Sequence, residues 1–262
     1  ISVSAFLLNR SSDLAIPPVL EGLQYLSTDK NEYAKCFALH RYEGGVKLLC
    51  TDDGRRYLFA GKADTDSDKL SDENNSAEAS QADMIVIQAP PEHIYLAATA
   101  VMSHFDAVGA VPSIALSSIR REDWYIDAAR EAMENGEILY GGKYSAPDYE
   151  KMVSIGVDLA IESTMILHTP KVQEKIEQLG IPVLIDRSSY EPEPLGRAEW
   201  VKVYGALTGR EAEAQQAFEE QKNAAASLNA DTGRSAAVFS INSTKQIVTR
   251  KPGDYMARMV EE

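Results

Sequence analysis

Side chains that could bind a small ligand follow several of the apolar strands that the sequence predicts. Arg187 and Tyr190 come directly after one such strand, and residues 162–164 end another. An arginine can hold carboxylate or catecholate oxygens with two parallel N–H bonds, and a tyrosine adds a flat ring and a hydroxyl. Two plainer interpretations stay open: Arg187 forms a surface ion pair, for example with Glu191, and Tyr190 only packs.

The strands that carry these residues are predicted to be parallel, which would bring their outgoing loops together. In a parallel α/β sheet the carboxyl ends of the strands share one edge, and ligands bind outside that edge. We therefore expect one rim that is rich in aromatic and hydrogen-bonding side chains. The predicted ligand-binding residues are Tyr95, Trp124, Tyr125, Lys143, Tyr144, Ser163, Thr164, Met165, Arg187 and Tyr190.

Enzymatic chemistry has little support in the motifs. No predicted strand is followed by a Gly-x-Gly-x-x-Gly or Walker loop, and no Gly-x-Ser-x-Gly nucleophile elbow is present. Ser163 has no base beside it in the sequence. An enzyme would use Glu162 or His168 as its acid–base group, and this alternative stays open.

Direct metal binding has equally weak support. The histidines are scattered, and only His93 and His168 fall in predicted rim loops, whereas zinc and manganese sites gather several His and carboxylate ligands. Met165 and His168 could together hold a haem iron. The plainer interpretation is that Met165 packs and that His168 precedes the cap of the next helix.

Strands alternate with helices over the middle of the chain, which is typical of an α/β fold with a mainly parallel sheet. A capping box at Ser145 and Asp148 is expected to start one helix. Thr169 and Pro170 are expected to start another helix, which stops at Gly180. The predicted strands are residues 84–88, 113–116, 137–140, 158–162 and 182–186, and the predicted helices are residues 94–108, 123–134, 146–155 and 170–179.

A small β-meander is predicted before this α/β region. Residues 33–59 read as three strands, with glycine turns at residues 43–45 and 52–54. The two cysteines of the chain, Cys36 and Cys50, could face each other across a hairpin and oxidise, or remain free thiols.

Two segments around the meander are harder to interpret. Residues 14–26 are ambiguous, and one interpretation is a helix entered through Pro17 and Pro18. Residues 61–82 are polar and acidic with almost nothing to bury, which predicts a surface loop.

The pattern changes after residue 195. One helix is predicted over residues 195–209 and a long charged helix over residues 210–228, followed by a strand, a hairpin through residues 242–245 and a short helix from Asp254. These last elements look like the start of a second α/β lobe, and we expect that lobe to be incomplete at the end of this chain. The predicted organisation is an N-terminal segment (1–82), an α/β lobe (83–194), linking helices (195–230) and the start of a C-terminal lobe (231–262).

Composition narrows the classes of function. The chain has 262 residues, 44% of them hydrophobic and 25% charged, with a net charge of −14 and a pI near 4.8. An acidic chain lacks the basic face that nucleic-acid binding needs. No apolar run approaches the roughly 18 residues that read as a membrane-spanning helix. The chain begins at Ile1, so we expect a processed or trimmed N-terminus, without its signal or lipid anchor.

The order of these pieces resembles the substrate-binding proteins of ABC importers for iron-siderophores, haem and cobalamin. The resemblance covers most of the chain and rests on "EHIYLAATAVMSHFDAVGAV", "YSAPDYEKMVSIGVDLAIES", "KIEQLGIPVLID" and "YGALTGREAEAQQAFEEQ". It implies two Rossmann-like lobes joined by a rigid helix, with an iron chelate, haem or corrinoid held in the cleft between them. The long meander and acidic segment before residue 83, and the missing part of the second lobe, depart from the family pattern.

The resemblance also implies a role, a location and a partner. Such a protein performs no chemistry and needs no cofactor; it is a monomer in the periplasm, or held by a lipid anchor outside the cytoplasmic membrane. It delivers its ligand to the transmembrane permease subunits. Glu150 resembles the acid that docks to permease arginines, although a solvated helix-surface glutamate is the plainer interpretation. The alternatives are an enzyme, or a zinc- or manganese-binding protein, on the same two-lobed fold.

Overall fold

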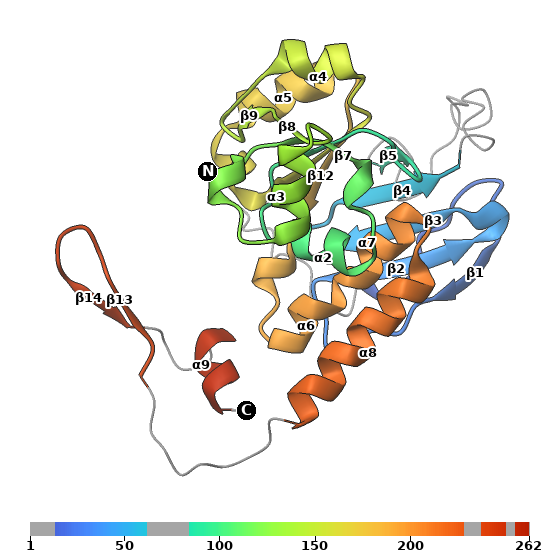
Figure 1. Cartoon of the computed structure of the whole chain (residues 1–262). Coiled ribbons are helices and arrows are strands. Elements are labelled where there is room, and N and C mark those ends of the chain that lie inside the picture. The colour runs from blue at the N-terminus through green and yellow to red at the C-terminus, as the bar shows by residue number, and fades with distance from the viewer. Residues whose placement is uncertain (1–13, 62–83, 228–236, 250–254, 262) are drawn as a thin grey trace, which may run out of the picture.

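The structure is a computed structural model that describes residues 14–61, 84–227, 237–249 and 255–261 (Figure 1). Two five-stranded sheets form its centre. The first sheet has the order β1-β2-β3-β4-β5, and the second has the order β12-β11-β6-β7-β8. The predicted acidic loop at residues 61–82 lies almost wholly outside the described residues.

The first sheet is the predicted meander with one strand added on each side. Its strands are β1 (Tyr25–Thr28), β2 (Phe37–Tyr42), β3 (Lys47–Thr51), β4 (Arg56–Ala60) and β5 (Met84–Gln88). Strands β1 to β4 pair antiparallel, and β5 joins β4 in parallel. The expected glycine turns are confirmed: Gly44 has φ 73° and Gly54 has φ 87°, a conformation that favours glycine.

The interpretation of residues 14–26 as a helix is wrong. The end of this segment forms β1, and its Pro18 carbonyl accepts a hydrogen bond from the Tyr42 hydroxyl. Prolines supply no amide for a helical ladder, and the apolar Leu20 instead covers the outer face of the meander.

Cys36 and Cys50 are free, buried thiols. They belong to different apolar clusters: Cys36 lies just before β2, and Cys50 is part of β3. Burial raises the pKa of both thiols, so neither is a reactive thiolate at neutral pH.

The second sheet is parallel throughout, as predicted. Its strands are β6 (Ile94–Leu96), β7 (Ile114–Ser117), β8 (Leu139–Tyr140), β11 (Leu159–Ser163) and β12 (Val183–Asp186). Two of its features were predicted wrongly. Residues 84–88 belong to the meander sheet, and residues 94–96, predicted to be helical, form the central strand of this sheet.

The physical reason is burial on both faces. Ile94, Tyr95 and Leu96 are at most 1% exposed, because helices cover the sheet on each side. Such a short apolar run cannot be assigned to a strand or a helix by periodicity alone. The helix begins only at Val101.

Helices pack on both faces of the parallel sheet. The helices between β6 and residue 209 are α2 (Val101–Ala107), α3 (Asp127–Glu134), α4 (Tyr149–Ile155), α5 (Pro170–Gln178), α6 (Pro194–Glu199) and α7 (Val201–Thr208). Side chains from α2 and α7 share one core with Ile161 of β11, whereas Met152 of α4 and Ile176 of α5 pack with Ala160 on the other face. Neighbouring residues of β11 therefore serve opposite faces of the sheet.

Two predicted helix starts differ in detail. The N-cap of α4 is Asp148, whose side chain accepts a hydrogen bond from the Lys151 amide at 3.0 Å. Ser145 instead lies in the turn between the short strands β9 (Gly142–Lys143) and β10 (Ala146–Pro147). Thr169 occupies the N-cap of α5, but its hydroxyl donates to the Ile166 carbonyl rather than capping the helix.

The predicted helix over residues 195–209 is split into α6 and α7, and it ends at Gly209 as expected. The long helix α8 (Glu211–Ser227) then packs against α7. Gly205 permits this contact, because a Cβ at that position would lie 2.4 Å from the Ala214 Cβ. The anchors predicted for α8, Ala214 and Phe218, are buried.

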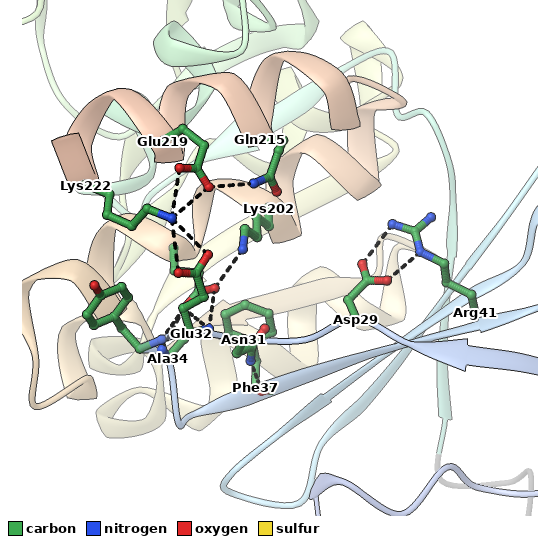
Figure 2. A network of polar contacts seen from close by, with 12 residues as sticks. Asp29, Asn31, Glu32, Ala34, Phe37, Arg41, Lys202, Gln215, Glu219 and Lys222 are labelled. Carbon is green, nitrogen blue, oxygen red and sulfur yellow. Dashed lines mark hydrogen bonds and ion pairs between the residues drawn. The ribbon is translucent and has the colours of Figure 1, made fainter.

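Polar contacts fasten α6, α7 and α8 to the loop between β1 and β2, and Figure 2 shows part of this network. The buried Glu199 carboxylate accepts the backbone amides of Glu32, Tyr33 and Ala34, each at 2.8 Å, and pairs with Lys202. Nearer the surface, Lys222 of α8 bridges Glu32 and Glu219.

The last described elements are an antiparallel hairpin and a short helix, as predicted. The hairpin pairs β13 (Phe239–Ile241) with β14 (Ile247–Thr249), and the helix is α9 (Tyr255–Glu261). The helix α9 contacts α6, where Arg258 pairs with Glu193 and the Arg197 guanidinium lies 3.4 Å from the centre of the Tyr255 ring. That these elements begin a second lobe remains a prediction. None of the described helices is long and apolar enough to cross a membrane.

Candidate functional site

The carboxyl edge of the parallel sheet has a topological switch point between β6 and β11. From β6 the chain moves outward to β7 and β8 on one side, and it later returns to form β11 and β12 on the other. The amides of Ala97 and Ala98 donate to the Ile161 carbonyl at 2.8 and 3.1 Å, which closes the seam between the two strands. Loops that leave such a seam in opposite directions open a crevice between them, where α/β proteins bind ligands.

A cavity of about 250 Å³ lies beside this edge, between the start of α2, the loop after β12 and α6. Helix α9 packs next to it, since Tyr255 covers the guanidinium of Arg197, a cavity-lining residue. The lining residues are Ala100, Ser103, His104, Ser188, Ser189, Arg197 and Ala198.

The cavity wall is held by a buried hydrogen-bonded group. The Asp186 carboxylate accepts the hydroxyls of Ser188 and Tyr204, both at 2.7 Å. His104 stacks on the Tyr204 ring, with 5.4 Å between ring centres. Burial lowers the pKa of His104 to about 4, so a neutral imidazole faces the cavity at physiological pH.

Arg187 does not present a free guanidinium to a ligand. Its Nε and Nη2 donate to the two carboxylate oxygens of Asp52 at 2.5 and 3.0 Å, and its Nη1 pairs with Asp53 at 3.3 Å. The side chain is only 11% exposed, and it lies over the Tyr190 ring. In this structure, Asp52 and Asp53 in the turn between β3 and β4 engage the guanidinium, and the predicted ligand-binding role of Arg187 stays an untested prediction.

The alternative of an ion pair between Arg187 and Glu191 is wrong about the partner, because Arg187 pairs with Asp52 and Asp53. Glu191 is itself buried and accepts the amides of Lys35 and Cys36 and the indole N–H of Trp200. It fastens the loop after β12 to the start of β2.

Two further predicted ligand-binding residues are buried in the core. Tyr95 is 0% exposed and donates its hydroxyl to the Gly142 carbonyl, and Trp124 is 4% exposed and donates its indole N–H to Ser117. Neither side chain is open to a ligand in this structure, because aromatic side chains of this size are buried for their apolar area, and their ligand-binding roles stay untested predictions. Tyr125, the neighbour of Trp124, is 96% exposed.

The remaining predicted residues lie at the surface of the rim loops. Lys143 and Met165 are exposed, and Tyr144, Ser163 and Thr164 are half-buried. The Ser163 side chain accepts the Met165 amide at 3.4 Å, at the start of the turn that follows β11. Their predicted role in ligand binding stays a proposal.

The sequence-based reasoning overlooked Arg120, which follows β7 in a predicted rim loop. Its guanidinium lies over the Tyr140 ring at 4.4 Å, and the side chain is exposed. The signal that could have found it is the one used for Arg187, an arginine that follows a strand of the parallel sheet.

The groups suggested for an enzyme or a metal site lie in different surroundings. Glu162 is 0% exposed, and burial raises its pKa to about 8. His168 is exposed on a different loop from His93. The described residues include no cluster of three or more His, Cys, Asp or Glu side chains that could hold a metal ion.

Comparison with known proteins identifies this fold. The petrobactin-binding protein YclQ from Bacillus subtilis superimposes with a TM-score of 0.52 at 13% identity, over 67% of this chain and 59% of its own. A possible iron-binding, periplasmic solute-binding protein from Staphylococcus epidermidis gives 0.51 at 18% identity, over 66% and 65%. Holo-ViuP gives 0.51 at 17% identity, over 67% and 58%. The chain thus has the fold of these binding proteins.

Sequence comparison adds one relative. An uncharacterized lipoprotein of Methanocaldococcus jannaschii is 31% identical over 97 residues, which is 37% of this chain and 23% of the lipoprotein. No model of a known protein family matches. The chain spans about three fifths of the length of the solved structures and under a quarter of the lipoprotein.

Proposed function

We propose that this chain, which shares its fold with periplasmic solute-binding proteins, captures an iron chelate, either a siderophore or haem, and delivers it to an ABC importer. The observation that carries the proposal is the cavity beside the switch point of the parallel sheet, with α9 packed next to it. Cavities at this edge are where open α/β sheets bind ligands. The printed descriptions of the structural neighbours as petrobactin-binding and iron-binding proteins support a chelate as ligand.

Arg120, exposed in the loop after β7 at the same carboxyl edge of the sheet, is the cation that we propose recognises an anionic chelate. An arginine that lies over an aromatic ring keeps its edge N–H groups available for carboxylate or catecholate oxygens. Because the chain carries a net charge of −14, an anionic ligand needs such a local positive group. Lys143, exposed at the end of β9, adds a second positive charge to this side of the rim. Both features favour siderophore or haem over cobalamin.

Delivery would use the outer surface of the same lobe. Glu150 is exposed in the first turn of α4, where a carboxylate can reach a partner without contacting the ligand. We propose that it docks to arginines of the permease, giving steering and register rather than ligand affinity. The lipoprotein relative supports an extracytoplasmic, lipid-anchored location, and we propose that the protein acts there as a monomer without catalysing a reaction.

The proposal is tested by calorimetric titration of the full-length protein with ferric siderophores, haem and cobalamin. One of the anionic chelates should bind, and Arg120→Ala should weaken it by about 1.5–3 kcal/mol through loss of charge-assisted hydrogen bonds. The matched control is Arg121→Ala, because Arg121 is exposed beside it but pairs with Glu134 at 3.7 Å. Preference for cobalamin, or equal losses in the two variants, would contradict the role of Arg120. Absence of binding to all three ligands would contradict the proposed function itself.

A further inference from the structure

Glu162 is a buried acid that the proposed function does not use. It is the penultimate residue of β11, is 0% exposed, and neither carboxylate oxygen has a hydrogen-bond partner among the described residues. A buried polar group without a partner is costly, so its presence directly beneath the rim calls for a physical account.

Two tyrosines are the titratable groups that face Glu162. Ala160 pairs with Tyr95 of β6, and Glu162, two residues further along β11, points to the same face of the sheet. Burial and the charge of Glu162 both raise the pKa values of Tyr95 and of Tyr149 in α4. The apolar Ile176 of α5 and Ile185 of β12 belong to the core on this face.

The cation of α4 nearest to this group is already engaged. The Lys151 ammonium donates to the Tyr140 carbonyl at 2.8 Å and pairs with Asp148 at 3.4 Å. The effect of burial on Glu162 is thus not offset by an opposite charge.

Tyr95 connects this acid to the β9–β10 hairpin above it. Its hydroxyl donates to the Gly142 carbonyl at 3.1 Å, which is long for a bond between a hydroxyl and an oxygen. Gly142 has φ 84°, and a Cβ there would lie 2.6 Å from the Ala146 carbonyl oxygen, so the hairpin is tight at the anchored residue. The same hairpin carries Lys143 and Tyr144 at the rim.

We propose that Glu162 and Tyr95 form a pH-sensitive latch for the β9–β10 hairpin. The structure shows the Tyr95 hydroxyl bonded to the Gly142 carbonyl, and in the proposed latch this arrangement belongs to protonated Glu162. When Glu162 loses its proton to solvent, its carboxylate becomes the stronger acceptor, takes the Tyr95 hydroxyl and releases the hairpin. Burial raises the pKa of Glu162 to about 8, which places the release in mildly alkaline solution.

The latch is independent of which ligand the protein binds. It predicts only that the hairpin is ordered below the pKa of Glu162 and loosened above it. If the rim binds a ligand, the release would move Lys143 and Tyr144 and lower affinity at alkaline pH.

Amide hydrogen exchange of the full-length protein, followed by NMR, tests the latch. The reporter is the Asp148 amide, which donates to the Gly141 carbonyl at 2.8 Å across the base of the hairpin. After correction for base-catalysed exchange, its protection should fall roughly tenfold between pH 6.5 and pH 9.5, as expected for loss of one anchoring hydrogen bond. The Leu49 amide, at the centre of the meander sheet, should keep its protection over the same range.

Two variants separate the latch from general loosening. Glu162→Gln cannot ionise and should keep the hairpin protected at both pH values, whereas Tyr95→Phe should show low protection at both. Equal losses in the wild type and Glu162→Gln would overturn the proposal. In the wild type, the carbon-13 shift of the Glu162 carboxyl should titrate with the same midpoint as the loss of protection. A carboxyl that titrates while hairpin protection stays constant would overturn the proposal even if Tyr95→Phe fails to fold.

Discussion

Two buried glutamates, one in the scaffold and one beneath the rim, show how differently this chain treats the same side chain. Glu199 is 0% exposed and accepts three backbone amides and the Lys202 ammonium. Glu162 is equally buried and accepts nothing from the described residues. The hydrogen bonds that Glu199 accepts make the contact between the meander and the linking helices rigid. Glu162 lacks such bonds, so its protonation state and its partner can change.

The two sites should also respond to pH in opposite directions. Burial alone would raise the pKa of Glu199, but Lys202 and the backbone amides lower it overall, so its stabilising effect is lost as pH falls through the folded-state pKa. Burial raises the pKa of Glu162 from 4.5 to about 8. Between these two values the unfolded chain has lost the proton and the folded chain still holds it, so the free energy of unfolding falls as pH rises through this range.

The largest expected effect is that of Glu199→Leu. The change leaves three backbone amides and an ammonium without their acceptor, and it should lower the free energy of unfolding by about 3–5 kcal/mol. Urea denaturation at pH 7 measures this loss. Glu213→Leu is the control, because Glu213 is 51% exposed and pairs with Arg210 at only 3.8 Å. A loss below about 1 kcal/mol at Glu199 would end the contrast between the two sites.

The same substitution beneath the rim should have the opposite sign. At pH 9, Glu162→Leu replaces a buried carboxylate with an apolar group. The cost of burying that charge exceeds the gain from one hydrogen bond with Tyr95, so the change should raise the free energy of unfolding by about 1–3 kcal/mol. The gain should be smaller at pH 5, where the carboxyl is protonated in the folded protein. Urea denaturation at the two pH values measures the difference. Destabilisation at pH 9 would show that the interactions of Glu162 outweigh the cost of burying its charge, and it would remove the comparison.

Arg187→Ala tests whether Arg187 stabilises the fold or binds the ligand. The change removes the two-pronged bond to Asp52 and should lower the free energy of unfolding by about 1.5–3 kcal/mol, while ligand affinity stays unchanged. Because the two residues act as a pair, the double variant with Asp52→Ala should lose less than the sum of the single variants. A large loss of ligand affinity with intact stability would instead restore Arg187 to the ligand site.

Glu150→Arg should have the smallest effect on the isolated protein. The side chain is exposed, so the free energy of unfolding should change by less than about 0.5 kcal/mol and ligand affinity should be kept. Transport in a reconstituted importer should fall sharply if Glu150 docks to the permease. Glu174→Arg, exposed on α5, provides a matched charge reversal. Equal transport by both variants would show that Glu150 is an ordinary surface residue.

Local patterns were sufficient for much of the scaffold. The glycine turns of the meander, the alternation of strands and helices after residue 113, the anchors Ala214 and Phe218 of α8, and the C-terminal hairpin were all predicted from neighbouring residues. Each depends on turn chemistry or periodicity over a few residues. The resemblance to binding proteins of ABC importers likewise depended on the order of such segments, and the structural neighbours confirm its fold.

Partners and burial were decided by the tertiary structure. Strand β5 pairs with the meander and β6 takes the centre of the parallel sheet, although both are short apolar runs. Arg187 meets Asp52, a residue 135 positions earlier, whereas the Arg120 guanidinium lies over Tyr140 and pairs with no carboxylate among the described residues. Periodicity identifies which residues can form an element, but long-range packing selects its neighbours. The sequence therefore determined the elements and the polar residues near the rim, and only the folded chain decided which of them remain available to a ligand.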